Sequence, residues 1–168
     1  MKQTGFRLDF IASLLVCAIV LGVALYMEFA MGLDPCLLCM SQRFVFLAIA
    51  FISLLAVLHN PIFGGHKVYG GIITLLAIGG AALAIRQLYL QGLPADQVPA
   101  CGPGFDFMLE AFPFTEVLVA MITGSGSCAE VQWTFMGISI PGWSLIAFAL
   151  LGLNGLRLTF SRAKLLLV

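Results

Sequence analysis

Long apolar runs separated by short polar breaks dominate the hydrophobicity pattern of the chain. A helix that crosses a bilayer needs about 20 predominantly apolar residues. Four runs meet this requirement, over approximately residues 8–29, 39–58, 68–90 and 143–160. The pattern therefore predicts an all-α membrane protein, a bundle of four transmembrane helices that forms one integral membrane domain over residues 1–168.

The connections between these runs differ greatly in length. Residues 30–38 form a short first loop, residues 59–65 a short turn, and residues 91–142 a long mixed segment. Within the long segment, Pro113–Ile122 is apolar but too short to span a membrane. We expect a short helix there, which either lies on the membrane surface or packs on the bundle.

The distribution of basic residues predicts the orientation of the bundle. The long loop contains no lysine or arginine but carries five acidic residues. Six basic residues share the opposite side: Lys2, Arg7, Lys67, Arg157, Arg162 and Lys164. Cytoplasmic loops are enriched in basic residues, so we expect both termini in the cytoplasm and both loops, 30–38 and 91–142, on the outer side of the membrane.

The composition agrees with a membrane protein: 61% of the residues are hydrophobic and only 10% are charged. The formal net charge is zero, so no polyanionic partner such as nucleic acid is implied. A cleaved signal peptide is an alternative for the first run. That run exceeds the usual apolar core of about 7–15 residues and lacks a convincing cleavage site, so a retained span is favoured.

Four of the five cysteines lie on the predicted outer side, where oxidising conditions let disulfides persist. They are Cys36, Cys39, Cys101 and Cys128; Cys17 lies alone in the middle of the first span and is most simply a small apolar filler. Four cysteines allow three pairings, between which sequence alone does not choose. Proximity favours Cys36 with Cys39 and leaves Cys101 with Cys128.

The motif Cys36-Leu37-Leu38-Cys39 opens the second span. A helix N-terminus stabilises a thiolate, and Arg43 lies one turn further on the same face. We therefore predict a redox-active dithiol with Arg43 as a nearby cation that supports Cys39 and a bound carrier, although Arg43 can instead extend to the lipid headgroups.

Two alternative roles remain for the Cys36–Cys39 motif: half of a zinc site, or a purely structural disulfide. Zinc needs further ligands, and both histidines, His59 and His66, fall on the opposite side of the membrane. Cys101 and Cys128 can in principle complete a four-thiolate site. An oxidising compartment argues against it, so redox chemistry is favoured over metal binding.

The loop cysteines are predicted to form an exchangeable disulfide rather than a rigid staple. Cys128 follows the flexible run Gly124–Ser127, and Cys101 lies within the extended segment Pro99–Gly104.

Glu28, Arg43 and Arg86 should lie at similar depth, near the outer face of the membrane. An ion pair of Glu28 with Arg43 or with Arg86 is therefore expected inside the bundle.

Taken together, these motifs resemble the DsbB family, the disulfide bond formation proteins of the bacterial inner membrane. The residues that carry the resemblance, across nearly the whole chain, are Pro35-Cys36-Leu37-Leu38-Cys39, Arg43, Cys101, Cys128-Ala129-Glu130, Gln132-Trp133, Phe135-Met136-Gly137 and Pro141-Gly142-Trp143. The resemblance implies a membrane protein-dithiol:quinone oxidoreductase. Such an enzyme reoxidises a periplasmic DsbA-like thiol oxidase and passes two electrons to ubiquinone or menaquinone, which sustains disulfide formation in exported proteins.

The resemblance also implies a role for each site residue. Cys101 would be attacked by the DsbA thiolate, and the released Cys128 would form a transient disulfide with Cys36. Cys39 would then meet the quinone, with Arg43 supporting quinone binding.

Two departures from the family pattern concern the quinone. Gly92 stands where many members carry a histidine, and Met40-Ser41-Gln42 lacks the aromatic-acidic pair of some relatives.

Two other functions compete with this interpretation. An enzyme that delivers electrons outward would need an inner or mid-membrane cysteine pair, and only Cys17 is available there. A non-enzymatic four-span scaffold with a disulfide-stapled outer loop needs neither Cys36 and Cys39 at the membrane rim nor Arg43 beneath them.

Overall fold

Four long helices build the protein in this computed structural model: α1 (Gln3–Met31), α2 (Leu37–His59), α3 (Gly65–Gln91) and α6 (Ile140–Phe160). All four are long and apolar enough to cross a membrane. Each contains one of the predicted spans, so the predicted all-α, four-helix fold class is confirmed. The structure describes residues 3–60, 64–94, 96–98, 107 and 110–161.

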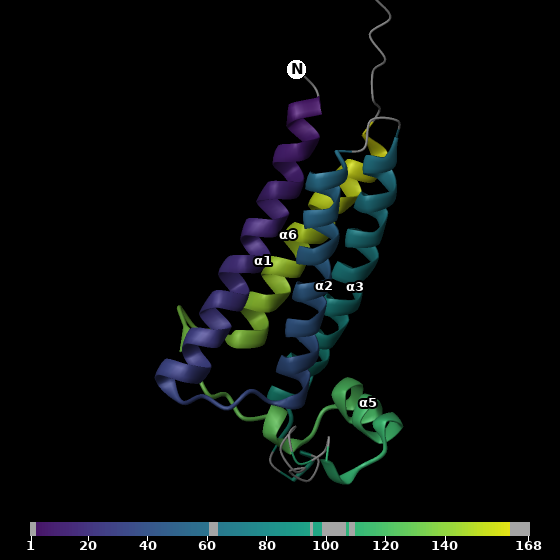
Figure 1. The fold of residues 1–168 in the computed structure, drawn as a ribbon. Helices are drawn as coiled ribbons and strands as arrows, with labels where there is room; N and C mark the ends of the chain where they lie inside the picture. The colour runs from purple at the N-terminus through teal and green to yellow at the C-terminus, as the bar shows by residue number, and fades with distance from the viewer. Residues whose placement is uncertain (1–2, 61–63, 95, 99–106, 108–109, 162–168) are drawn as a thin grey trace, which may run out of the picture.

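The four helices run side by side as a bundle (Figure 1). The beginning of α1, the α2–α3 turn and the end of α6 lie at one end. The opposite end, here called the α5 end, carries the α1–α2 loop and the short elements of the long loop. These are α5 (Phe114–Thr123), the 3₁₀ helix η1 (Gly126–Cys128), and β1 (Thr134–Phe135) paired antiparallel with β2 (Ile138–Ser139).

The short helix expected over Pro113–Ile122 is present as α5, displaced by one residue. Val117 faces inward and is buried, whereas Phe114, Val119 and Ile122 are exposed. One side of α5 therefore packs on the bundle, and the other is left open.

Small residues set the closest helix contact, between α3 and α6. A Cβ atom added to Gly70 would lie 2.8 Å from the carbonyl oxygen of Gly155 and 2.9 Å from Leu158 Cβ. Lipid offers little hydrophobic drive for helix association, so glycine brings the backbones near enough for van der Waals packing. The α3–α6 pair is the most extensive contact in the described bundle.

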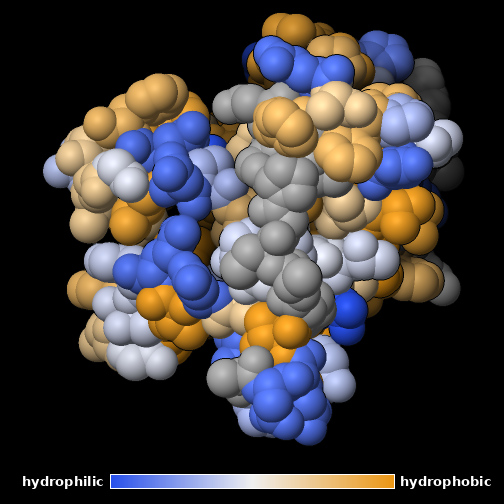
Figure 2. Space-filling model, turned by 90° about the horizontal axis from the view of Figure 1, so that it is seen from below, coloured by the Kyte–Doolittle hydropathy of each residue, from blue (hydrophilic) through white to orange (hydrophobic). Residues whose placement is uncertain are grey.

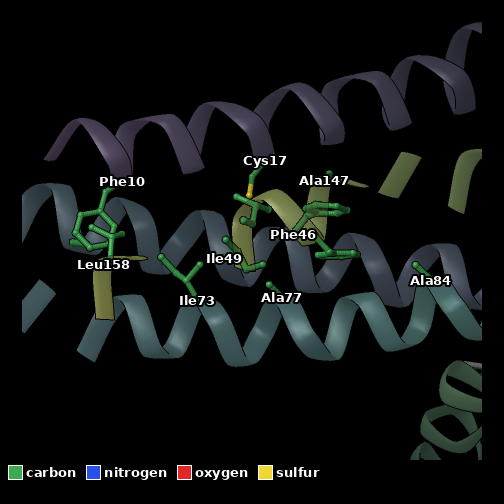
Figure 3. Packing of buried hydrophobic residues seen from close by; sticks show 12 residues of the cluster. Phe10, Cys17, Phe46, Ile49, Ile73, Ala77, Ala84, Ala147 and Leu158 are labelled. Atoms are coloured by element: carbon green, nitrogen blue, oxygen red, sulfur yellow. The ribbon is translucent and has the colours of Figure 1, made fainter. Parts of the chain in front are cut away.

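The core runs along the centre of the bundle, where side chains from all four helices meet (Figure 3). Phe46 of α2 stacks on Phe148 of α6 with ring centroids 4.1 Å apart. Cys17 points from α1 into this core and is fully buried, as expected for an apolar filler.

Helix α1 packs mainly on α2 and contacts α6 only sparsely. Polar contacts join α1 to α6 toward the end where the chain begins, including an ion pair of Arg157 with Asp9 at 4.0 Å. The Asn154 amide of α6 donates to Ser13 Oγ at 2.9 Å and to the Asp9 carbonyl oxygen at 3.1 Å. Between α1 and α6 the bundle is therefore loosely closed.

Replacing Gly70 by alanine should destabilise the bundle, because the new methyl group would meet the backbone of α6 and force the helices apart. We expect a loss of about 1–3 kcal/mol, read as a lower midpoint of thermal unfolding in detergent. Gly79→Ala is the matched control on α3, since its added Cβ would have no atom within 4 Å. Equal stability of the two variants would contradict the close packing.

Candidate functional site

Three cysteine sulfurs converge at the α5 end of the bundle. Cys36 Sγ lies 3.0 Å from Cys39 Sγ, and the Cys36 side chain also hydrogen-bonds Cys128. All three are free thiols here; Cys36 and Cys128 are buried, and Cys39 is partly buried. Cys36 therefore lies between the motif cysteine of the same helix and a cysteine of the long loop.

The start of α2 positions the motif. Cys36 is the N-cap residue in an extended conformation, and its sulfur accepts a hydrogen bond from the Cys39 backbone N–H at 3.4 Å. Cys39 lies in the first turn of the helix, as predicted. The unpaired N–H groups and partial positive charge of this terminus favour negative charge on sulfur.

A glutamine from α3 completes the contact with the dithiol. Gln87 Nε2 donates to Cys36 Sγ at 3.3 Å and to Cys39 Sγ at 3.1 Å. Its Oε1 accepts a hydrogen bond of 2.7 Å from Gln42 Nε2 on α2. Both glutamines are only 3% exposed.

The segment before Cys128 is folded, which corrects the prediction of a flexible run. Gly124 has a φ of +77°, and its position would bring an added Cβ to 2.7 Å from Leu38 Cδ1. The Gly124 N–H bonds the Ala120 carbonyl, and η1 then buries Cys128 completely. Glycine and serine allow a tight path over leucine side chains, and this packing holds the segment in place.

Helix α5 is tied to the bundle at its C-terminal end. Ser41 Oγ of α2 donates to the Met121 carbonyl at 2.8 Å, and Arg86 Nε of α3 donates to the Thr123 carbonyl at 3.3 Å. The position of Cys128 is thereby linked to α2 and α3.

Hydrogen bonds among the sulfurs divide the acidity of Cys36 and Cys128. Hydrogen bonds to Cys128 and Cys39, together with burial, raise the pKa of Cys36 well above its ordinary value. The hydrogen bond from Cys36, helped by the backbone N–H groups of Leu38 and Ser125, lowers the pKa of Cys128 to about 6 despite burial. Cys36 is therefore the proton donor of this pair, and Cys128 carries the charge.

Arg43 forms the ion pair with Glu28 that the sequence offered as one of two choices. It also donates to the Ala24 carbonyl at 3.1 Å, so the guanidinium is bound to α1. Arg43 is therefore not among the side-chain donors to Cys39 Sγ, which are the Cys36 thiol and the Gln87 amide, so the prediction that it supports this thiolate is corrected. The other candidate, Arg86, lies over the Tyr89 ring instead.

A small cavity lies between Cys39 and Arg43. It has a volume of about 60 Å³ and is also lined by Gln42 and Ser144. A larger apolar groove of about 440 Å³ adjoins it between α1 and α6 and shares Val20, Ala24, Met27, Ile140 and Ser144 with it. The sparse α1–α6 contact leaves this groove open.

The structure thus brings together Cys36, Cys39 and Cys128, with Arg43 beyond the cavity. Cys101 lies outside the described residues. Among those residues, no three His, Cys, Asp or Glu side chains are arranged to bind a metal ion. Sequence reasoning missed Gln42 and Gln87 as site residues, although polar side chains inside apolar spans are a signal for function.

The charge on Cys128 gives the reduced protein a pH-dependent stability. The pKa of Cys128 is about 6 when folded, against an ordinary 9.0. Its stabilising contribution is complete above pH 9.0 and is lost as the pH falls toward about 6. We expect the unfolding midpoint of the reduced protein to rise over this window, and Cys128→Ser to remove that part of the rise. Identical pH profiles for both proteins would contradict the assignment.

Comparison with known proteins agrees with this geometry. The family model described as "Disulfide bond formation protein DsbB" matches residues 7–157. A Disulfide bond formation protein B of Hahella chejuensis is 58% identical over 134 residues, which cover 80% of this chain and 81% of that protein. A Disulfide bond formation protein B of Marinobacter nauticus is 54% identical over 148 residues, which cover 88% of each chain.

A third relative of the same name, from Nitrosococcus oceani, is 50% identical over 92% of this chain and 91% of its own length. No solved structure matches the chain significantly. A match over most of the chain at such identities, with the cysteine cluster in place, settles the family. The chain belongs to the DsbB family of multi-pass inner-membrane enzymes, which oxidise protein thiols and pass the electrons to quinone.

Proposed function

We propose that this protein reoxidises a periplasmic DsbA-like thiol oxidase through Cys101, Cys128, Cys36 and Cys39, and passes the electrons to membrane quinone beside Arg43. One observation carries the proposal: Cys36 contacts both Cys39 and Cys128. A sulfur in that position can exchange its bond with one neighbour for a bond with the other.

The first half of the reaction is thiol–disulfide exchange. A thiolate of the partner attacks Cys101 of a Cys101–Cys128 disulfide and forms a mixed disulfide, which releases Cys128 as a thiolate. Cys128 then attacks Cys36 of a Cys36–Cys39 disulfide and releases Cys39 as a thiolate. The second partner thiolate resolves the mixed disulfide, releases Cys101 and leaves the partner oxidised.

Backbone N–H groups of Leu38 and Ser125 lower the pKa of Cys128 independently of the Cys36 thiol. A thiolate leaves more readily when its pKa is low, so these donors favour the release of Cys128. Cys128 is buried against Cys36, so the attacking sulfur of Cys128 already lies next to the Cys36 sulfur that it attacks.

The second half of the reaction restores both disulfides. Cys101 attacks Cys128 of the Cys36–Cys128 disulfide, which re-forms Cys101–Cys128 and releases Cys36. Cys36 and Cys39 together then lose two electrons and two protons and close their own disulfide. The quinone supplies the sink for those electrons and protons and becomes quinol.

The residues beside Cys39 fit a quinone. The small cavity offers polar groups of Arg43, Gln42 and Ser144 to a carbonyl-bearing ring. The adjoining groove between α1 and α6 is apolar and suits an isoprenoid tail. The fit is the same for ubiquinone and menaquinone, because both combine a dicarbonyl ring with such a tail.

The placement in the membrane follows the charges. The basic side of the bundle, with both termini, faces the cytoplasm, and the α5 end faces the periplasm. Hydrophobic and hydrophilic residues are interspersed over the α5 end (Figure 2). The exposed apolar residues of α5, such as Phe114 and Ile122, rest at the membrane surface, and residues 1–168 act as one integral membrane domain.

The scaffold alternative has less support. A stapled scaffold has no use for a buried amide on its cysteine sulfurs, nor for a polar cavity beside Cys39. Membership of an enzyme family also favours turnover.

Quinone reduction tests the relay directly. The purified protein in detergent, given a reduced DsbA-like partner, should reduce ubiquinone or menaquinone, and Cys39→Ser should lower the rate to background because no thiolate then faces the quinone. Cys17→Ser is the control that should keep activity. A folded wild-type protein that reduces neither quinone would leave the scaffold as the leading account.

Arg43 should contribute to quinone binding separately from its ion pair. Arg43→Gln alone leaves Glu28 unpaired and should lower stability; the double variant Glu28→Gln with Arg43→Gln should recover it. The quinone KM should stay about tenfold or more above wild type in the double variant, since the charged donor is still missing. A wild-type KM in a folded double variant would remove Arg43 from the quinone site.

A further inference from the structure

The glutamine pair at the dithiol is a buried polar contact beside the sulfurs that the cysteine relay leaves unexplained. Gln87 comes from the middle helix of the α2–α3–α6 packing, and its amide reaches two reactive sulfurs at once. Burying an amide in a membrane domain is costly unless its donors and acceptors are matched. A hydrophobic residue would fill the same volume at lower cost, so the amide has a chemical use.

The orientation of the Gln87 amide is set by its partner. Gln42 Nε2 donates to Gln87 Oε1 at 2.7 Å, so the Gln87 amino group turns toward the sulfurs. Its distances to Cys39 and Cys36 Sγ are 3.1 and 3.3 Å, while Gln87 Oε1 lies 3.6 Å from Cys39 Sγ. The shorter contacts are thus those of the amino group.

That orientation suits one charge state of the dithiol. A thiolate only accepts hydrogen bonds, whereas a thiol is a weak donor and a disulfide sulfur a weak acceptor. Hydrogen bonds to a charged group are also stronger than those to a neutral one. An amino group held against Cys39 therefore favours the thiolate over both other forms.

The cation suggested by the sequence does not supply this interaction. The Arg43 guanidinium is engaged by Glu28 and by the Ala24 carbonyl. The helix N-terminus helps, but its backbone N–H at Cys39 points to Cys36 Sγ. For Cys39 Sγ, the side-chain donors in the described structure are the thiol of Cys36 and the amide of Gln87.

We propose that Gln87 is a catalytic residue that stabilises the Cys39 thiolate, and that Gln42 is a positioning residue that keeps the Gln87 amino group turned toward the sulfurs. The assignment rests on the proposed function for its purpose, because Cys39 becomes a thiolate when Cys128 attacks Cys36. Stabilising the leaving sulfur speeds that step and holds the negative charge next to the cavity beside Arg43.

Alkylation of the fully reduced, full-length protein tests the assignment without partner or quinone. Iodoacetamide is added over a range of pH, and peptide mapping by tandem mass spectrometry follows Cys39 separately from Cys36. Gln87→Met removes the amide with little change of volume. Losing a hydrogen bond to a charged sulfur should weaken Cys39 ionisation about tenfold, which moves the midpoint of its alkylation profile up by about one pH unit.

The matched control is Gln91→Met, one turn further along α3. The Gln91 side chain accepts a hydrogen bond from Ser139 Oγ at 2.9 Å, so this variant removes an amide without removing a donor to sulfur. Its Cys39 midpoint should equal that of the wild type. A Gln87→Met protein with native helicity and a wild-type midpoint would overturn the proposal.

Gln42→Leu tests the positioning role and remains decisive if Gln87→Met does not fold. It should shift the Cys39 midpoint in the same direction but by less, because a free Gln87 amide still faces the sulfurs part of the time. Adding Gln42→Leu to Gln87→Met should cause no further shift, since Gln42 acts through Gln87. Additive shifts, or no shift in a folded Gln42→Leu protein, would reject the positioning role.

The redox equilibrium of the pair gives a second, independent measure. Less stable thiolate means a less stable reduced form, so Gln87→Met should shift the Cys36–Cys39 equilibrium toward the disulfide about tenfold, or ~30 mV. An unchanged equilibrium would contradict the proposal. If wild type reduces no quinone while both shifts occur, the proposed function fails and the Gln87 contact stands.

Discussion

Polar groups inside this bundle need partners in the protein, because the hydrocarbon of a membrane offers no water. Among the described buried side chains, only Ser53 Oγ lacks one. That constraint explains the interior contacts one by one. Arg43 pairs with Glu28, Asn154 bonds Ser13, and Gln42 bonds Gln87. These contacts join different helices, so the satisfaction of polar groups also fixes how the helices meet.

The same constraint gives the dithiol its properties. At the start of α2 the backbone N–H groups lack helical partners, and a sulfur there is an available acceptor. Cys36 caps the helix through its own sulfur, and Cys128 accepts from the Leu38 backbone. Charge on sulfur is thus favoured by fixed dipoles, while the Arg43 guanidinium is bound by Glu28 and the Ala24 carbonyl.

Close packing and loose packing occupy opposite sides of the bundle. Gly70 and Gly155 bring α3 and α6 into backbone contact toward the end of the bundle opposite the sulfurs. Helix α1 touches α6 only sparsely, and the apolar groove lies between those two helices. Helix α6 is therefore closely packed on its α3 side and borders an open apolar groove on its α1 side.

The sequence by itself determined the four helices, the short α5 segment and the cysteine motif, because spans and amphipathic pieces are read from local runs of side chains. It also limited the ion pair to Glu28 with one of two arginines. Only the tertiary structure chose Arg43, turned a run such as Gly124–Ser127 from flexible into folded, and set Gln87 against the sulfurs. Those outcomes depend on which side chains from different helices come into contact, and a local sequence pattern does not determine contacts between residues far apart in the chain.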